Sequence, residues 1–137
     1  MKVLHLDGLP PNVLTDDVVF IRAVRTGIPG KVVQEAVELL GGHRELVAAL
    51  VGSTPGNIQR IYSKPALGKV ESEGILDLLR LFAYASAIFD SDDIVREWLR
   101  CHLPALSGSR PADLLDTFQG RIMVRDVLNK IERGEFS

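Results

Sequence analysis

The sequence lacks the features that mark secreted and membrane-spanning proteins. It has one cysteine, Cys101, among 137 residues, so it contains no internal disulfide and suits a reducing compartment. Its most apolar stretch, Ile75–Phe89, is 15 residues long and carries Asp77 and Arg80, which is too short and too charged to span a bilayer. Residues 1–14 hold no apolar run typical of a signal sequence. We therefore expect a cytoplasmic protein with no membrane partner.

The sequence also lacks a strong net charge. Its formal charge is −2 and its isoelectric point is near 5.9, which argues against binding nucleic acid over its whole surface and leaves room for a local basic patch. Hydrophobic residues make up 46% and charged residues 25%, the balance of an ordinary globular protein. The length suffices for one domain or for two small helical lobes.

Motifs for catalysis and metal binding are missing as well. His5, His43 and His102 lie in three different segments, and Cys101 adjoins His102. Adjacent residues on a helix point about 100° apart, so Cys101 and His102 cannot form a nucleophile–base pair with each other. Neither Cys-x-x-Cys nor His-Glu-x-x-His spacing occurs, and no Gly-rich phosphate loop is recognisable. We predict a non-enzymatic protein without catalytic residues, metal or cofactor.

Glycine and proline divide the chain into short amphipathic segments, which predict an all-α fold. Only residues 3–6 alternate weakly, as a short edge strand or a loose end would. Ile75–Phe89 is apolar on more than one face, which favours a central core helix over part of a subunit interface. Trp98, the only tryptophan, is more typical of a core anchor than of a ligand site. The predicted helices are capped or bounded by these residues: Thr15 to Gly27, Pro29 to Gly41, His43 to Val51, Thr54 to Pro65, Val70 to Phe89, Ser91 to Pro104, a short helix with Leu114 and Leu115, and, after a break at Gly120, Arg121 to Arg133.

Two of these segments resemble a helix-turn-helix, with one helix over 43–51, a turn at Gly52 and a second helix from Thr54. Residues 43–69 carry four cations against Glu45 alone, a net of +3, whereas residues 71–97 carry seven acids against two arginines, a net of −5. Clustered cations are what phosphate contacts require. The alternative is a solvated helix face. The candidate DNA-binding residues are Thr54, Asn57, Arg60 and Lys64.

The most specific part of the chain is its last 28 residues. A motif, Arg110-Pro111-x-Asp113-Leu114-Leu115-x-Thr117, precedes Gly120 and an amphipathic helix that runs to within four residues of Ser137. This segment would be a hairpin that completes the core, or a helix whose end is inserted into a pocket of another protein.

With the Trp98-Leu99 pair and the Pro104-Ala105-Leu106 step, this motif resembles the Xre/MbcA/ParS family of type II antitoxins, which pair with RES-domain toxins. The resemblance implies an N-terminal helical region with a Xre-like helix-turn-helix (1–69) and a central helix with a C-terminal toxin-binding domain (70–137). It implies that Arg110, Asp113, Leu114 and Thr117 build a scaffold. The toxin-binding residues that it implies are Arg121, Arg125, Lys130, Glu132, Arg133, Glu135, Phe136 and Ser137.

What the resemblance implies for function is an antitoxin that neutralises a RES-domain toxin, an enzyme that consumes NAD or transfers its ADP-ribose. The C-terminal segment would occlude the toxin's active site. The family also implies a homodimer that represses its own promoter DNA. Two alternatives stay open: a stand-alone helix-turn-helix transcriptional regulator that dimerises through its C-terminal hairpin, and a structural helical adaptor.

Overall fold

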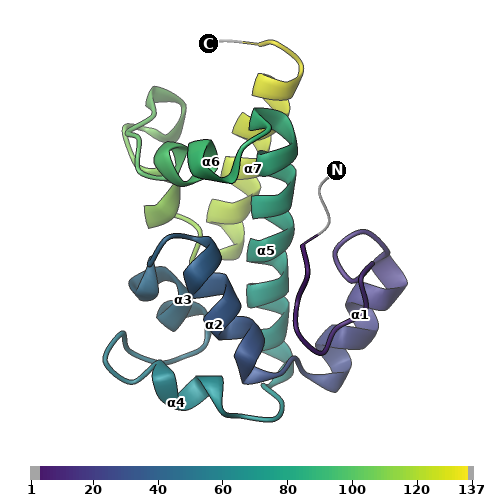
Figure 1. Ribbon diagram of the computed structural model, residues 1–137. Helices are drawn as coiled ribbons and strands as arrows, with labels where there is room; N and C mark the ends of the chain where they lie inside the picture. Colours follow the sequence, from purple (N-terminus) through teal and green to yellow (C-terminus); the bar gives the residue numbers. More distant parts are fainter. Residues whose placement is uncertain (1–3, 136–137) are drawn as a thin grey trace. The chain divides into compact units, whose positions relative to one another are not determined.

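Residues 4–135 of the computed structural model are described here, and they form helices and no strand (Figure 1). The all-α prediction is therefore confirmed, and the weak alternation that begins at residue 3 gives no strand over its described residues 4–6. None of the helices within this range is long and apolar enough to cross a membrane. The elements are α1 (Asp17–Thr26), α2 (Gly30–Leu39), α3 (Arg44–Leu50), α4 (Gln59–Tyr62), α5 (Lys69–Phe89), α6 (Asp92–Trp98), the 3-10 turns η1 (Pro104–Leu106) and η2 (Pro111–Asp113), and α7 (Phe118–Glu132).

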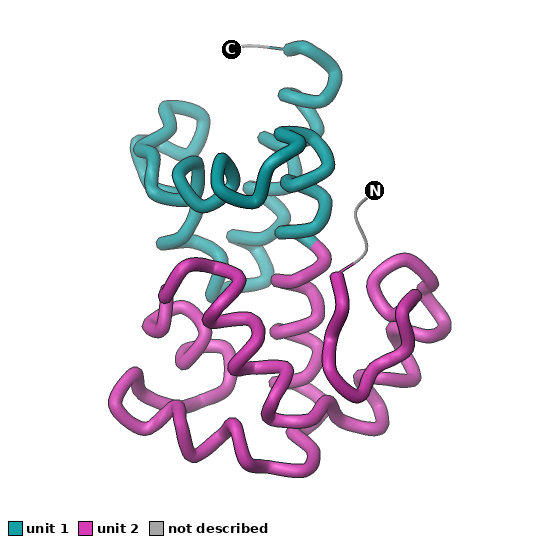
Figure 2. The backbone as a smooth tube through the Cα atoms, in the orientation of Figure 1, with its two compact units in different colours: residues 1–2, 81–137 teal, residues 3–80 magenta. Residues whose placement is uncertain are grey.

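The described chain divides into two compact units, residues 4–80 and residues 81–135 (Figure 2). The chain passes from one to the other between Arg80 and Leu81, inside α5. The predicted boundary after residue 69 separates two regions of different predicted function, and these functional assignments stay predictions.

In the first unit, α1 begins one residue later than predicted. Asp16, not Thr15, is the N-cap, and its Oδ1 accepts hydrogen bonds from the backbone N–H groups of Val18 and Val19 at 2.9 and 3.1 Å. A carboxylate stabilises this end of a helix more than a hydroxyl because it also meets the positive end of the dipole. The predicted stop at Gly27 is confirmed, since this residue has φ +91°.

Helix α2 packs against α4 through a glycine. A Cβ on Gly30 would lie 1.8 Å from the carbonyl oxygen of Ile61, and the N–H of Gly30 donates to the carbonyl of Lys64 at 2.9 Å. Only glycine permits this approach of two backbones. The contact holds the start of α2 against the segment that contains α4.

The predicted helix from Thr54 is wrong in its start. The chain between Thr54 and Arg60 forms successive turns, with hydrogen bonds from Asn57 N–H to the Thr54 carbonyl and from Arg60 N–H to the Asn57 carbonyl, and α4 comprises only Gln59–Tyr62. The Ser53 hydroxyl bonds the Thr54 carbonyl instead of capping a helix. Gly56 disfavours helix by about 1 kcal/mol relative to alanine, which a one-turn segment does not recover. The first helix of the predicted helix-turn-helix is present as α3.

Helix α5 supplies core residues, as the sequence predicted. Its side chains from Ile75 to Ala85 are almost all buried, including Ile75, Leu76, Leu79 and Phe82. Two polar groups are buried with them and have partners. The Ser72 hydroxyl accepts the N–H of Ile28 at 3.0 Å, and Asp77 accepts a hydrogen bond from Arg80 at 2.9 Å. The bond between Ser72 and Ile28 fixes the start of α5 in register, because sliding the helix would leave both groups without partners.

In the second unit, α6 is capped as predicted. The Ser91 hydroxyl accepts the N–H of Ile94 at 3.2 Å. Leu99, just beyond the helix, is buried, and its carbonyl accepts the N–H of Ala112. Trp98 is half-buried with its ring centroid 5.6 Å from that of Phe89. Helix α6 and η2 are thus tied together through Leu99.

The motif at 110–117 forms the support for α7. Arg110 makes a two-pronged ion pair with Asp113, at 2.8 and 2.7 Å, and Pro111 begins η2. The predicted short helix with Leu114 and Leu115 is wrong, because the helical turn is η2 and ends before them. Pro111, Ala112 and Leu115 are buried.

Gly120 does not break the last helix, contrary to the sequence prediction. Helix α7 begins at Phe118, and Thr117 caps it by accepting the N–H of Gly120 at 2.9 Å. A Cβ on Gly120 would lie 1.6 Å from the carbonyl oxygen of Leu114. The glycine is required for the close packing of two backbone segments, so it stands inside the first helical turn.

The other end of α7 is held by Tyr84, which lies in the part of α5 that belongs to this unit. The Tyr84 hydroxyl bonds Asn129 and donates to Glu132 at 2.9 Å. Burial raises the pKa of Tyr84 above its ordinary value of 10.0, and the hydrogen bond to Glu132 and the negative charge of Glu132 add to this, while Arg133 opposes it. Tyr84 thus favours its protonated form, which donates to α7.

We predict that Gly120→Ala destabilises the protein by about 3 kcal/mol or more, because the added methyl group overlaps a backbone carbonyl that cannot move without displacing η2. Gly56→Ala is the matched control, since a Cβ there meets nothing within 4 Å, and its effect should stay within about 0.5 kcal/mol. Urea unfolding followed by circular dichroism measures both. Equal stabilities of the two variants would contradict the assigned role of Gly120.

We predict that Tyr84→Phe costs about 1 kcal/mol at neutral pH, the usual net value of a lost hydrogen bond. Since the pKa of Tyr84 is raised in the folded state, its contribution is complete below pH 10 and is lost as the pH rises through the folded-state pKa. The difference in unfolding free energy between wild type and Tyr84→Phe should therefore be constant up to about pH 9 and shrink above pH 10. A difference that grows with pH would show that the sign is wrong.

Candidate functional site

The predicted toxin-binding residues lie on α7 and on the segment that follows it, and the structure separates them into two groups. Lys130, Glu132, Arg133 and Glu135 gather at the end of the helix with exposed side chains. Arg125 is half-buried. Arg121 is 7% exposed, and its guanidinium donates to the carbonyl of Leu115 at 3.0 Å. Arg121 thus supports the scaffold here. Phe136 and Ser137 lie outside the described residues.

The chain leaves α7 through a defined turn. The N–H of Glu135 donates to the carbonyl of Lys130 at 2.8 Å, and the N–H of Gly134 donates to the carbonyl of Ile131 at 3.0 Å. Gly134 has φ +74°. These two bonds and the left-handed glycine form a Schellman motif, which terminates a helix and directs the chain that follows. Arg133 Nε lies 3.5 Å from Glu135 Oε1, across the same turn.

The motif residues carry out the supporting role that was predicted for them. Arg110 and Asp113 bind each other, Thr117 caps α7, and Leu114 presents its carbonyl to Gly120. Sequence reasoning missed one further residue near the end of the helix, Tyr84, which anchors it. A glycine just after a helix with basic last-turn residues predicts a C-terminal cap, and the structure confirms that the helix ends before Gly134, where the chain turns.

The predicted DNA-binding residues Thr54, Asn57, Arg60 and Lys64 are all exposed. Only Arg60 belongs to a helix, the four-residue α4, and Thr54 and Asn57 lie in the turns before it. The structure therefore does not reproduce the second helix of the predicted helix-turn-helix. DNA binding by these four residues stays a prediction.

Cys101 and His102 bind different backbone carbonyls. Cys101 is exposed with its sulfur 3.4 Å from the carbonyl oxygen of Glu97, and His102 bonds the carbonyl of Gly108 through Nδ1 at 2.9 Å. Between residues 4 and 135, no three His, Cys, Asp or Glu side chains gather so as to hold a metal ion.

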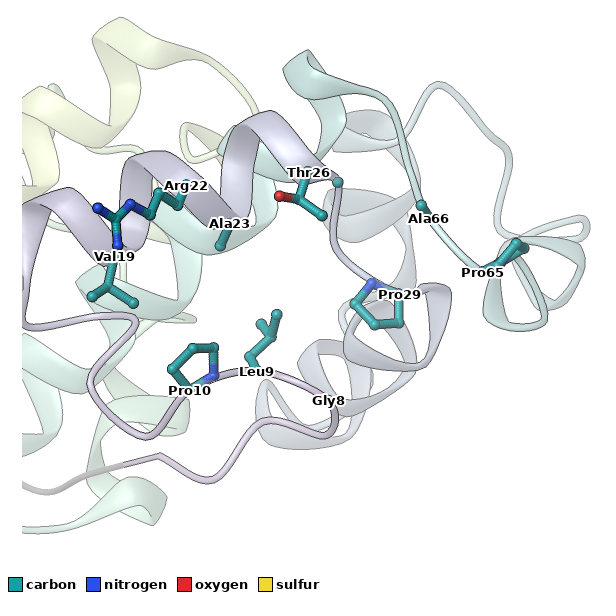
Figure 3. A pocket seen from close by; sticks show the side chains of 11 residues that line it. Gly8, Leu9, Pro10, Val19, Arg22, Ala23, Thr26, Pro29, Pro65 and Ala66 are labelled. Carbon is teal, nitrogen blue, oxygen red and sulfur yellow. The ribbon is translucent and has the colours of Figure 1, made fainter.

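The first unit contains a cavity of about 500 Å³ between α1 and the segment of residues 8–10 (Figure 3). Leu9 and Pro10 lie on one side, and Val19, Arg22 and Ala23 of α1 lie on the other. Arg22 is the only charged residue in its lining, and none of the predicted site residues contributes to it. This cavity is separate from the C-terminal site.

Comparison with known proteins finds a family domain within the C-terminal unit. Residues 85–134 match the family described as the antitoxin Xre/MbcA/ParS C-terminal toxin-binding domain. The chain is also 35% identical over 80 residues to the "Prs ADP-ribosylating antitoxin" of Sphingobium sp. (strain YBL2), which covers 52% of this chain and 50% of that protein. The chain thus spans about half the length of this relative. The resemblance inferred from the motif at 110–117 is confirmed for the C-terminal part of the chain: residues 85–134 match the C-terminal toxin-binding domain of Xre/MbcA/ParS antitoxins.

Proposed function

We propose that this chain is an antitoxin that neutralises a RES-domain toxin by occluding its NAD-binding active site with the segment that follows α7. The toxin would consume NAD or transfer its ADP-ribose. The support is the toxin-binding domain at 85–134 and a relative whose name refers to ADP-ribosylation. In this proposal the chain acts by binding alone.

The observation that carries this proposal is the fixed exit of the chain from α7. Thr117 and Gly120 hold the helix at its start, Tyr84 holds it near its end, and the Schellman motif at Gly134 sets the direction in which Glu135 leaves. A segment that is ordered before binding loses less conformational entropy on entering a cleft. Glu135 is therefore suited to enter an active site, and Phe136 is the next residue along the chain.

The charges at this end fit a cleft that binds a dinucleotide. Such a cleft must attract a pyrophosphate, so it should hold cations and hydrogen-bond donors that also accept the carboxylate of Glu135. Phe136 would fill an apolar or stacking position. Arg125, Lys130 and Arg133 would pair with acidic groups at the rim, together with Glu132 and Ser137 as further contacts. Arg121, being buried, would position the helix rather than touch the toxin.

We predict that deleting residues 134–137 abolishes neutralisation, because α7 ends at Glu132 and the blocking segment is then absent. The measurement is NAD consumption by the enzyme encoded in the adjacent reading frame, with and without the truncated chain. The truncated chain should stay folded with a slightly lower melting temperature, because it loses the two capping hydrogen bonds of Gly134 and Glu135 but no core residue. Full inhibition by the truncated chain would rule out the tail as the blocking element.

We predict that Gly134→Val weakens inhibition about tenfold relative to Gly134→Asn. A Cβ at Gly134 meets nothing within 4 Å, so the left-handed φ is the only constraint on the residue. Asparagine adopts this conformation readily, whereas a β-branched residue is disfavoured there by about 1–2 kcal/mol, or about tenfold in population. Titration of NAD consumption gives the inhibition constants. Equal constants for the two variants would show that the direction of the exit is unimportant.

A further inference from the structure

The toxin-binding domain contains a small cavity beside the end of α7. One wall is formed by Trp98 and by Pro104 and Ala105 of η1. The opposite wall is formed by Val127 and Ile131, which are four residues apart and so lie on one face of α7. Its volume is about 250 Å³. Lys130 and Glu135, both with exposed side chains, are the charged residues in its lining.

The wall opposite α7 is a rigid loop. Leu103 and Ser109 are joined by a backbone hydrogen bond of 3.1 Å, and Gly108 N–H donates to the Leu103 carbonyl at 2.9 Å. Leu106 of the same loop is buried at 2% exposure, and Trp98 is braced by Phe89. The cavity is therefore formed without a partner, which favours binding because little has to be ordered.

The size and charge of the cavity indicate what fits it. Sites for cofactors and small molecules measure about 300–1,000 Å³, so a cavity of this size suits one large apolar side chain. Glu135 is engaged by Arg133 at 3.5 Å. Lys130 makes no ion pair within the described residues, so its ammonium group leaves a positive charge beside the apolar cavity. The complementary occupant is an apolar side chain with a carboxylate near it.

We propose that this cavity receives an apolar side chain of the toxin, adjacent to an acidic residue that pairs with Lys130. The inference rests on the proposed antitoxin function and deepens it. Since Glu135 both lines the cavity and begins the blocking segment, the two contacts are continuous. In the complex, the antitoxin would insert its C-terminal segment into the toxin's active site, and the toxin would insert an apolar side chain into the antitoxin's cavity. Only the first of these contacts involves the active site.

The test is to fill the cavity with Ala105→Trp. Ala105 is exposed and follows Pro104 in a surface turn, so the variant should fold, which its melting temperature checks. The affinity for the purified enzyme from the adjacent reading frame, measured by calorimetry, should fall about tenfold or more, the value of burying one large apolar side chain. Ala49→Trp, at an exposed alanine of α3 in the first unit, is the matched control and should leave the affinity unchanged.

Lys130→Glu provides a second, independent variant on an exposed position. It should weaken binding, and the loss should diminish at high salt because the contact is electrostatic. Wild-type affinity in Ala105→Trp would overturn this inference while leaving the antitoxin function intact, since a loss in Lys130→Glu alone also follows from the rim contact of the proposed function. If the wild-type chain does not bind the enzyme at all, the proposed function itself fails, so the two failures are distinguishable.

Discussion

The contact between Gly120 and the carbonyl of Leu114 determines where α7 lies in the C-terminal unit. The two backbones approach so closely that no side chain fits between them, and the Thr117 hydroxyl completes the contact by capping the helix at the same point. Arg110 and Asp113 then hold η2, which Leu114 directly follows. A backbone contact is harder to shift than a side-chain contact because it has no rotamers to relax. The far end of the helix has contacts of its own, at Tyr84 and Gly134.

The arrangement separates buried from exposed charged residues along one helix. Arg121, in the first turns, is buried against the Leu115 carbonyl, whereas Lys130, Arg133 and Glu135 are exposed. A guanidinium with a carbonyl partner in the interior stabilises the scaffold, because removing it would leave a buried acceptor without a donor. Charges at the exposed end can change with the partner without disturbing the fold. Such a division would let different antitoxins of one architecture match different toxins.

Local signals in the sequence predicted much of the fold. Ser91 and Gly27 mark helix ends through their own backbone or side-chain chemistry, and these ends were placed correctly. Gly120 has the same local signature as Gly27, yet it stands inside a helix and is required by its contact with Leu114, whereas Gly27 ends a helix with φ +91° and also approaches the Leu67 carbonyl. The sequence around a glycine does not distinguish these two reasons, because the second depends on a neighbour in space.

The site was predictable to the same limited extent. The amphipathic helix and its charged end follow from periodicity, and the family motif indicates their use. The cavity beside Trp98 could not be predicted from periodicity or from the motif, because its prediction requires knowing that η1 faces Val127 and Ile131. The prediction of a longer helix from Thr54 failed for a related reason. Ser53, Thr54 and Pro55 have the composition of a helix start, but turns continue to Ile58 before α4 begins at Gln59.

If the segment after α7 and the cavity beside α7 both contact the toxin, as proposed, the two contacts differ in what they contribute to specificity. A tail that fills an NAD cleft must imitate features that all NAD-binding enzymes share, so it discriminates poorly among them. A cavity that accepts an apolar side chain beside a carboxylate contacts a part of the toxin that need not resemble other enzymes. A wrong partner would leave Lys130 without a counter-charge and the cavity unfilled. Inhibition and selection of the partner would then be exerted by adjacent but different surfaces, joined through Glu135.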